Sequence, residues 1–173
     1  VVKAHVATFN RNIKLIIGSE FTIDSHKVIV LVTNRNSYSK LSSLITLARR
    51  RSKKGSYQIK WSDLKFNNDG LLIIWLPCGD FKKDQLIISQ LHDWFERRLW
   101  IGFHNLLNGT ETSHLSYLQK LSLLWKVNVV ACGDVHMHKK DRQPLQDVLT
   151  AIKQKCSITV SYTHLRAHET LTD

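Results

Sequence analysis

The sequence predicts an α/β fold whose strands run parallel. Short apolar segments of about five residues, the usual strand length, alternate along the chain with longer segments of helical periodicity. The strand segments are apolar almost throughout, which is typical of strands buried on both faces, as in parallel sheets. Hydrophobic residues make up 43% of the chain, enough to fill such a core. Strands of this kind close into a barrel or form an open sheet, and in both cases ligands gather at the carboxyl ends of the strands.

Five segments carry this strand character. They are rich in Val, Ile and Leu, and turn residues such as Gly18 and Pro77 end two of them. The predicted strands are residues 14–17, 27–33, 71–76, 99–103 and 128–132. The first strand is therefore expected to end at the turn that contains Gly18, Ser19 and Glu20.

Helices are predicted between and around these strands, where apolar residues recur at helical spacing. The helical segments are residues 1–10, 38–51, 83–98, 111–126 and 144–153. Residues 34–37 form a turn and N-cap region before the second helix. Pro144 suits the first turn of the last helix. Residues 57–68 are expected to be irregular or to contain a short helix around 62–64.

The composition limits the class of protein. The chain has 173 residues, the size of one domain, and no apolar run long enough to span a membrane. Its 25 Lys and Arg residues outnumber 14 Asp and Glu residues, so the formal charge is +11. This balance fits a nucleic-acid partner, although many basic proteins bind none. The three cysteines form no spaced framework, which favours a reducing cytoplasm.

Side chains that can bind metal follow several of the predicted strands. Asp134 and His136 follow the last strand, and residues spaced two apart in an extended chain point the same way. That spacing suits two ligands of one ion, or an acid and base acting on one substrate. Glu20, Cys78 and His104 follow three other strands. Each alone has an ordinary structural explanation, but together they predict a metal site along one edge of the sheet.

The remaining histidines are interpreted differently. Four of them do not follow a predicted strand and are expected to be surface residues: His5, His26, His92 and His114. His138 lies one step beyond the Asp134 and His136 pair and is left unassigned.

The two ends of the chain are expected to be truncations. Residues 160–170, VSYTHLRAHET, resemble the translation of a transposase-type sequencing adapter. We therefore expect residues 160–173 to be an artefact without a domain, and residues 1–159 to be one domain fragment.

Several stretches resemble a known family in order along the chain. They are GSEF at 18–21, ITLARRR at 45–51, and GDVHMH with LQDVLTAI within 133–152. These stretches are similar to the polymerase-and-histidinol-phosphatase (PHP) domain of bacterial DNA polymerase III alpha subunits, and most closely to its error-prone, damage-inducible branch. The resemblance implies a distorted (β/α)7 barrel, here partial and truncated at both ends, with a metal centre at the strand carboxyl ends.

The resemblance also implies ligands for that centre. Glu20 matches the family's glutamate, and Asp134 and His136 match its last Asp-x-His pair. Cys78 lies where some members have a cysteine, and is the weakest of the four matches. The implied ion is zinc, manganese or iron. His104 stands where relatives commonly carry an acid, so no ligand role is carried onto it, and the family's first His-x-His motif would lie before Val1.

Three functions remain open from the sequence. The first is a PHP fragment of an error-prone DNA polymerase, a nucleotidyltransferase that performs translesion synthesis, in a bacterial cytoplasm. Its partners would be DNA and other translesion or replisome proteins, with no membrane. The carboxylates that bind Mg²⁺ in a polymerase palm are not in this chain, so the fragment alone is expected to be inactive. The alternatives are a stand-alone metal-dependent phosphoesterase and a non-catalytic structural module.

Overall fold

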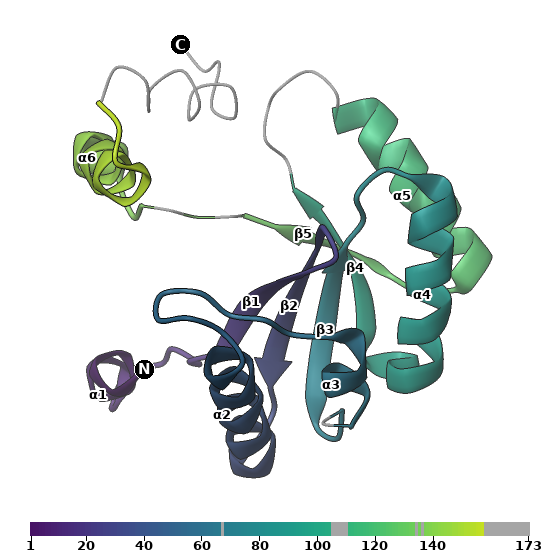
Figure 1. Cartoon of the computed structure of the whole chain (residues 1–173), viewed down its shortest axis with the longest axis horizontal. Helices are drawn as coiled ribbons and strands as arrows, with labels where there is room; N and C mark the ends of the chain where they lie inside the picture. Colours follow the sequence, from purple (N-terminus) through teal and green to yellow (C-terminus); the bar gives the residue numbers. More distant parts are fainter. Residues whose placement is uncertain (67, 105–110, 134, 136, 158–173) are drawn as a thin grey trace.

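The computed structural model describes residues 1–66, 68–104, 111–133, 135 and 137–157 (Figure 1). The predicted boundary between 1–159 and 160–173 lies outside these residues. The helices are α1 (Val2–Thr8), α2 (Arg35–Arg50), α3 (Trp61–Phe66), α4 (Phe81–Phe95), α5 (Glu111–Trp125) and α6 (Gln143–Gln154), with short 3₁₀ turns η1 (Glu96–Arg98) and η2 (Lys140–Arg142). The strands are β1 (Gly18–Ile23), β2 (His26–Val32), β3 (Leu71–Leu76), β4 (Leu99–His104) and β5 (Val129–Cys132). Among the described residues, no helix combines the length and apolar character that a membrane span requires.

The five strands form one sheet in the order β1-β2-β3-β4-β5. The β3–β4 and β4–β5 pairs are parallel, whereas β1–β2 and β2–β3 are antiparallel. The predicted α/β class is therefore confirmed, but the prediction of uniformly parallel strands is wrong for β2, which runs antiparallel to both of its neighbours. The sheet of the described residues is mixed and is not closed into a barrel.

A tight hairpin joins β1 to β2 and explains this difference. Asp24 and Ser25 both have positive φ, 46° and 72°, and Ile23 pairs directly with His26 across them. Two consecutive left-handed residues give the two-residue turn whose twist matches antiparallel strands. The predicted strand at 14–17 is wrong, because Gly18 already pairs with Leu31 and residues before 17 therefore run past the end of β2.

The two antiparallel steps restore the strand direction. β1 is antiparallel to β2, which is antiparallel to β3, so β1 points the same way as β3, β4 and β5. The carboxyl ends of these four strands consequently lie at one edge of the sheet. The hairpin turn also brings the first residue of β2, His26, to that edge. We call this edge the carboxyl edge.

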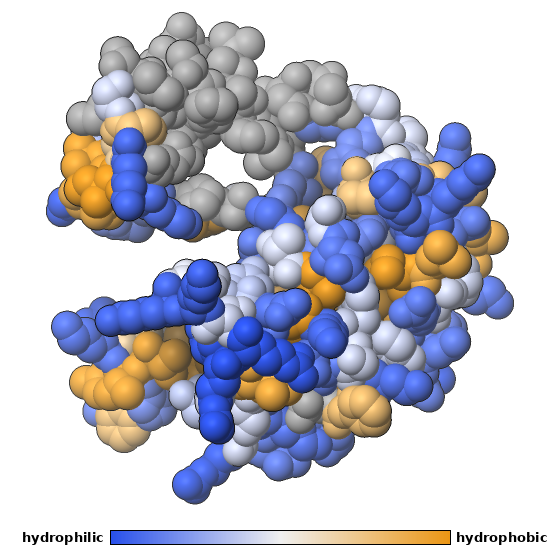
Figure 2. All heavy atoms as spheres, viewed as in Figure 1, coloured by the Kyte–Doolittle hydropathy of each residue, from blue (hydrophilic) through white to orange (hydrophobic). Residues whose placement is uncertain are grey.

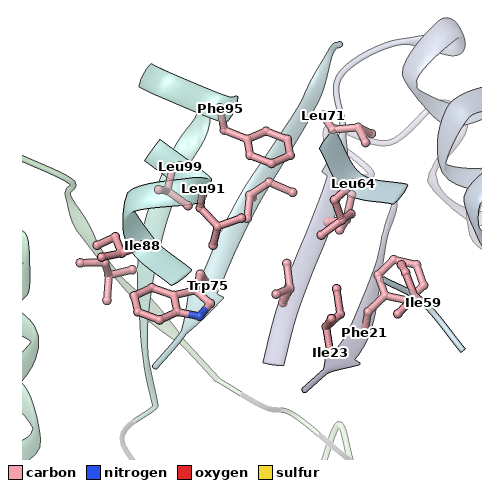
Figure 3. Close-up of a cluster of buried hydrophobic side chains, with 14 of the residues drawn as sticks. Phe21, Ile23, Ile59, Leu64, Leu71, Trp75, Ile88, Leu91, Phe95 and Leu99 are labelled. Atoms are coloured by element: carbon pink, nitrogen blue, oxygen red, sulfur yellow. The ribbon is translucent and has the colours of Figure 1, made fainter. Parts of the chain in front are cut away.

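One face of the sheet packs against four helices. The core cluster draws on alternate residues of the strands, such as Val28 and Ile73, and on buried residues of α2, α3, α4 and α5. Figure 3 shows Trp75, Leu91 and Phe95 within this cluster, and each is fully buried. In each of these helices the apolar residues recur at helical spacing, so that they share the helix face that packs against the sheet. At the start of α2, the Asn34 side chain accepts from the Ser37 backbone N–H in a reciprocal capping box, as the turn prediction implied.

The opposite face of the sheet, here called the open face, is only half-buried. Alternation along the strands puts these apolar side chains on it: Ile29, Leu31, Leu72, Ile74 and Trp100. Gly102 lies among them, and a Cβ there would approach Ile74 and Leu76 side-chain carbons at 3.0 Å. Glycine thus lets these neighbours close over β4.

Two helices leave their apolar residues exposed. Helix α1 has no buried residue, and Val2 and Val6 are 76% and 66% exposed. On α6, Leu149 and Ile152 are 53% and 69% exposed. Figure 2 shows these hydrophobic surfaces in orange on the two helices, which Figure 1 places away from the four-helix layer.

We expect the chain to self-associate through these surfaces, because water-exposed apolar helix faces favour burial against another copy. Replacing Leu149 and Ile152 together with Gln should shift the chain toward monomer in sedimentation velocity. The matched change on the same helix, Lys153→Gln, should leave the distribution unchanged. A monomeric unaltered chain would contradict the expectation.

A half-buried ion pair, in which Asp63 is buried and the Arg51 side chain is 33% exposed, fixes the start of α3. Arg51 Nη1 and Nη2 donate to the two oxygens of Asp63 at 2.5 and 3.1 Å, and the Lys60 backbone N–H donates to Asp63 Oδ2 at 2.9 Å. Burial by itself raises the pKa of Asp63, but the Arg51 and Lys60 hydrogen bonds outweigh it and hold the pKa below its usual value of 3.8. The charged form is therefore favoured by folding.

This predicts a stability difference that depends on pH. A carboxylate with a depressed pKa stabilises the fold above its unfolded pKa, and that contribution is lost as the pH falls below the unfolded value of 3.8 and through the folded pKa. Asp63→Asn should lower the free energy of unfolding at neutral pH by about 1.5–3 kcal/mol, the range for hydrogen bonds to charged groups. The gap from the unaltered chain should close at acid pH in urea titrations. The exposed Asp93→Asn should show no such gap; an equal gap at all pH values would exclude the charge as its cause.

Candidate metal centre

The prediction that Glu20 follows a strand is wrong, because Glu20 lies within β1. Three further residues continue β1 before its end at Ile23. Its side chain alternates with the buried Phe21 and so belongs to the open face, where it is 42% exposed. Glu20 Oε1 lies 3.4 Å from Nζ of Lys27, a side chain that is itself 46% exposed. Such an exposed pair contributes little to stability.

Asp134 and His136 lie outside the described residues. The strand that precedes them, β5, ends at Cys132 on the carboxyl edge. His104 is the last residue of β4 and pairs in register with Cys132, so it also lies at this edge. Burial raises the pKa of the Cys132 thiol, which keeps it protonated at neutral pH.

Cys78 lies in a different group from Glu20. It follows β3, and its Sγ lies with one ligand atom each of His26 and Asp84 in a set whose members are all within 4.8 Å of one another. Among the described residues this is the one group of three or more His, Cys, Asp or Glu side chains with that spacing. Glu20 is not part of it. We call these three residues the His26–Cys78–Asp84 cluster.

The prediction that His26 is a surface residue is wrong. Its side chain is 3% exposed, on the helix-covered face of the sheet. The His26 ring lies 6.0 Å, centroid to centroid, from the rings of both Trp61 and Trp75. The polar sequence TIDSHK conceals this position, and only the hairpin turn at Asp24 and Ser25 could have indicated it.

Asp84 was missed by sequence reasoning and is the hydrogen-bonding centre of the cluster. Its side chain is fully buried and accepts from the backbone N–H groups of Cys78 and Gly79 at 3.0 and 2.9 Å. The Tyr117 hydroxyl donates to Asp84 Oδ2 at 2.6 Å. Its position in the sequence could have indicated its burial. Asp84 occupies the first position of the buried stripe of α4, where an apolar residue is expected, and the stripe continues through Ile88, Leu91 and Phe95.

Asp84 also changes the acidity of its neighbours. Burial, together with the hydrogen bond to Asp84, raises the pKa of Tyr117 far above its ordinary value. Burial raises the pKa of the Cys78 thiol, and the Asp84 carboxylate adds to that effect. Both groups are therefore neutral at physiological pH when no cation is bound. Histidine nitrogen, thiolate sulfur and carboxylate oxygen are together the ligand types that zinc accepts.

Comparison with known proteins identifies relatives of the chain. No family model matches it. It is 40% identical over 97% of its length to a protein of Saccharophagus degradans named error-prone DNA polymerase. It is 41% identical over 88% of its length to the protein of that name in Methylococcus capsulatus, and 39% identical over 96% of its length to the one in Teredinibacter turnerae.

The chain spans only 15–16% of the length of these relatives. The predicted resemblance to the error-prone polymerase branch is confirmed by these names and by the breadth of the match. Over the residues that it matches, the chain is therefore a homologue of one segment of the bacterial error-prone DNA polymerases.

Proposed function

We propose that the chain is the PHP-domain segment of an error-prone DNA polymerase and serves there as a scaffold with a metal site. The supporting observation is the similarity of 35–41% identity that extends over about 90% of the chain but over about 16% of the relatives. In the parent protein, DNA would be the substrate and nucleotidyl transfer the reaction. The formal charge of +11 fits this, because Lys and Arg contact phosphates without regard to base sequence.

The proposed ligands of the PHP metal are Glu20, Asp134 and His136. Two carboxylates and an imidazole suit a divalent ion such as zinc, manganese or iron. Glu20 fits the role, since its side chain faces the open side of the sheet and its partner Lys27 is half-exposed. A bound ion would supply Lewis-acid activation of a phosphate oxygen or of water. Cys78, the fourth predicted ligand, lies with His26 and Asp84 instead.

The reading frame of the source DNA tests the proposal directly. We expect a long read across both ends to continue into a palm domain with clustered aspartates, which hold Mg²⁺ in two-metal nucleotidyl transfer. A frame that stops within a further domain's length would instead favour a stand-alone phosphoesterase. The same read decides whether residues 160–173 are adapter sequence.

Chelator is expected to lower the unfolding temperature of the full-length protein. An ion that binds only the folded state stabilises it by about 2.7 kcal/mol when the free ion is at 100 times its dissociation constant. Glu20→Gln should reduce the chelator effect measured by calorimetry, whereas the exposed Glu96→Gln should preserve it. A full-length protein without detectable metal and without a chelator effect would leave the domain as a non-catalytic structural module.

A further inference from the structure

The positive charge of the chain is concentrated in one stretch of the sequence. Residues 25–62 contain nine of the 25 Lys and Arg residues and none of the 14 Asp and Glu residues. The remaining 16 Lys and Arg residues nearly balance the acidic residues, all of which lie outside this stretch. The charge is densest at residues 49–54, RRRSKK, here called the basic segment. It covers the end of α2 and the start of the loop to α3.

Most of the charge of the basic segment is not neutralised. Arg51 is paired with Asp63, as described above. The other four cations are exposed and form no ion pair within the described part of the chain: Arg49, Arg50, Lys53 and Lys54. The negative end of the α2 dipole favours cations in the last turn of the helix, but this effect fades within that turn. It therefore explains Arg49 and Arg50 but not the two lysines that follow the helix.

Hydrogen bonds hold the loop that carries the basic segment at the carboxyl edge. The Ser56 backbone N–H donates to the Lys53 carbonyl at 3.1 Å, which closes a turn. The backbone N–H of Thr22, the residue before the end of β1, donates to the Tyr57 hydroxyl at 2.9 Å. The loop between α2 and α3 is thus tied to the carboxyl end of β1 (Figure 1). Its charges are presented at the edge where ligands of an α/β sheet gather.

The aromatic side chain of this loop is not available for stacking against a base. The Arg49 guanidinium lies 5.8 Å from the centroid of the Tyr57 ring, and the Phe21 ring meets that ring edge-on at a centroid distance of 6.2 Å. Proteins that hold single-stranded nucleic acid combine positive charge with aromatic rings on which bases stack. A basic surface whose ring is already occupied instead fits the phosphate backbone of a duplex, which is contacted without regard to base sequence.

We propose that the basic segment binds the phosphate backbone of duplex DNA. Each of its four cations without an acidic partner would contact a phosphate and release a counterion. Arg49 and Arg50 present planar sets of donors to phosphate oxygens, whereas Lys53 and Lys54 act as point charges. The choice of DNA as the polyanion rests on the proposed function, in which DNA is the substrate of the parent protein. The charge distribution and the geometry of the loop do not rest on it.

Fluorescence anisotropy of a labelled DNA duplex of mixed sequence, titrated with the full chain at several salt concentrations between about 50 and 200 mM, tests the proposal. The logarithm of the association constant should fall linearly with the logarithm of the salt concentration, by about 0.9 for each phosphate contact. Replacing Lys53 and Lys54 together with Gln removes two contacts and should make this slope shallower by about 1.8. Arg50→Gln should make it shallower by about 0.9.

A second double variant supplies the matched control. Lys120→Gln combined with Lys126→Gln removes the same charge from exposed positions in and directly after α5. Lys126 lies just before β5 begins, at the edge of the sheet opposite the carboxyl edge. This variant should therefore keep the slope of the unaltered chain. Circular dichroism of each variant monitors its folding.

The inference is overturned if the unaltered chain does not bind the duplex, or if the two double variants change the slope equally. Tighter binding of a single strand than of the duplex would also overturn it. The same holds if poly-glutamate displaces the duplex as effectively as unlabelled duplex does at equal charge, which would assign the surface to an acidic protein segment.

Failure of this inference is distinguishable from failure of the proposed function. A reading frame that continues into a palm domain would support the proposed function even if the basic segment binds no DNA. A frame that stops within a further domain's length would overturn the proposed function even if the duplex binds with the expected slopes.

Discussion

Asp84→Ala is expected to destabilise the fold by at least about 3 kcal/mol, because each buried donor left without an acceptor costs about 1–3 kcal/mol and Asp84 accepts from three of them. Asp84 accepts hydrogen bonds from Cys78 N–H, Gly79 N–H and the Tyr117 hydroxyl, and its side chain is fully buried. Alanine would leave these three donors without an acceptor. Water cannot readily take the place of the carboxylate, because the Asp84 side chain is fully buried. The β3–α4 loop and the contact between α4 and α5 should both loosen.

Urea unfolding of metal-free protein measures this effect. Tyr117→Phe removes one of the three hydrogen bonds and should cost about 1.5–3 kcal/mol, as for hydrogen bonds to charged groups. Asp93→Ala makes the same chemical change at an exposed position of α4 and should stay within about 0.5 kcal/mol of the unaltered chain. Equal stabilities of Asp84→Ala and Asp93→Ala would show that the network does not stabilise the fold.

Trp75→Ala is expected to cost a similar 3–5 kcal/mol, because it removes the largest of the fully buried side chains and leaves a cavity. Trp75 lies on the helix-covered face of β3, within the cluster that includes Leu91 and Phe95 (Figure 3). The surrounding side chains come from rigid strands and helices, so the site can collapse only partly.

Trp100 offers a matched control in the neighbouring strand. It is half-buried on the open face and pairs in register with Ile74, one position before Trp75. Trp100→Ala removes the same side chain but leaves a surface that water can fill, so its cost should be clearly smaller. Calorimetric unfolding of both variants compares them, and a larger loss for Trp100→Ala would mean that the open face is the main core.

Much of the fold could be predicted from local sequence patterns. Residues 71–76 and 99–103 are apolar runs of strand length bounded by turn residues, and β3 and β4 occupy those positions with at most one residue of difference. The helices at 38–51 and 111–126 were recognisable because their apolar residues recur at a spacing that one face of a helix requires. Such periodicities arise within a single element, so they can be read without knowing its neighbours.

The direction and extent of the first strands could not be predicted in this way. Residues 14–17 have strand composition, but β2 ends at Val32 and leaves most of them without a partner strand. Conversely, the polar sequence around Asp24 and Ser25 was not recognised as a two-residue hairpin turn. Pairing decides which residues become strand, because the backbone hydrogen bonds of a strand come from another segment.

Some of the residues that can bind metal could be recognised from the sequence, and others only from the tertiary structure. The sequence by itself identified Cys78 as a residue near a strand end, and determined the Asp-x-His spacing of Asp134 and His136 and the similarity to error-prone polymerases. Only the tertiary structure placed Glu20 on the open face and brought His26 and Asp84 to Cys78. His26 and Asp84 occur in polar or helical surroundings that are ordinary for surface residues. Their burial follows from how the hairpin, β3 and α4 pack together, and that contact between distant segments has no local signature in the sequence.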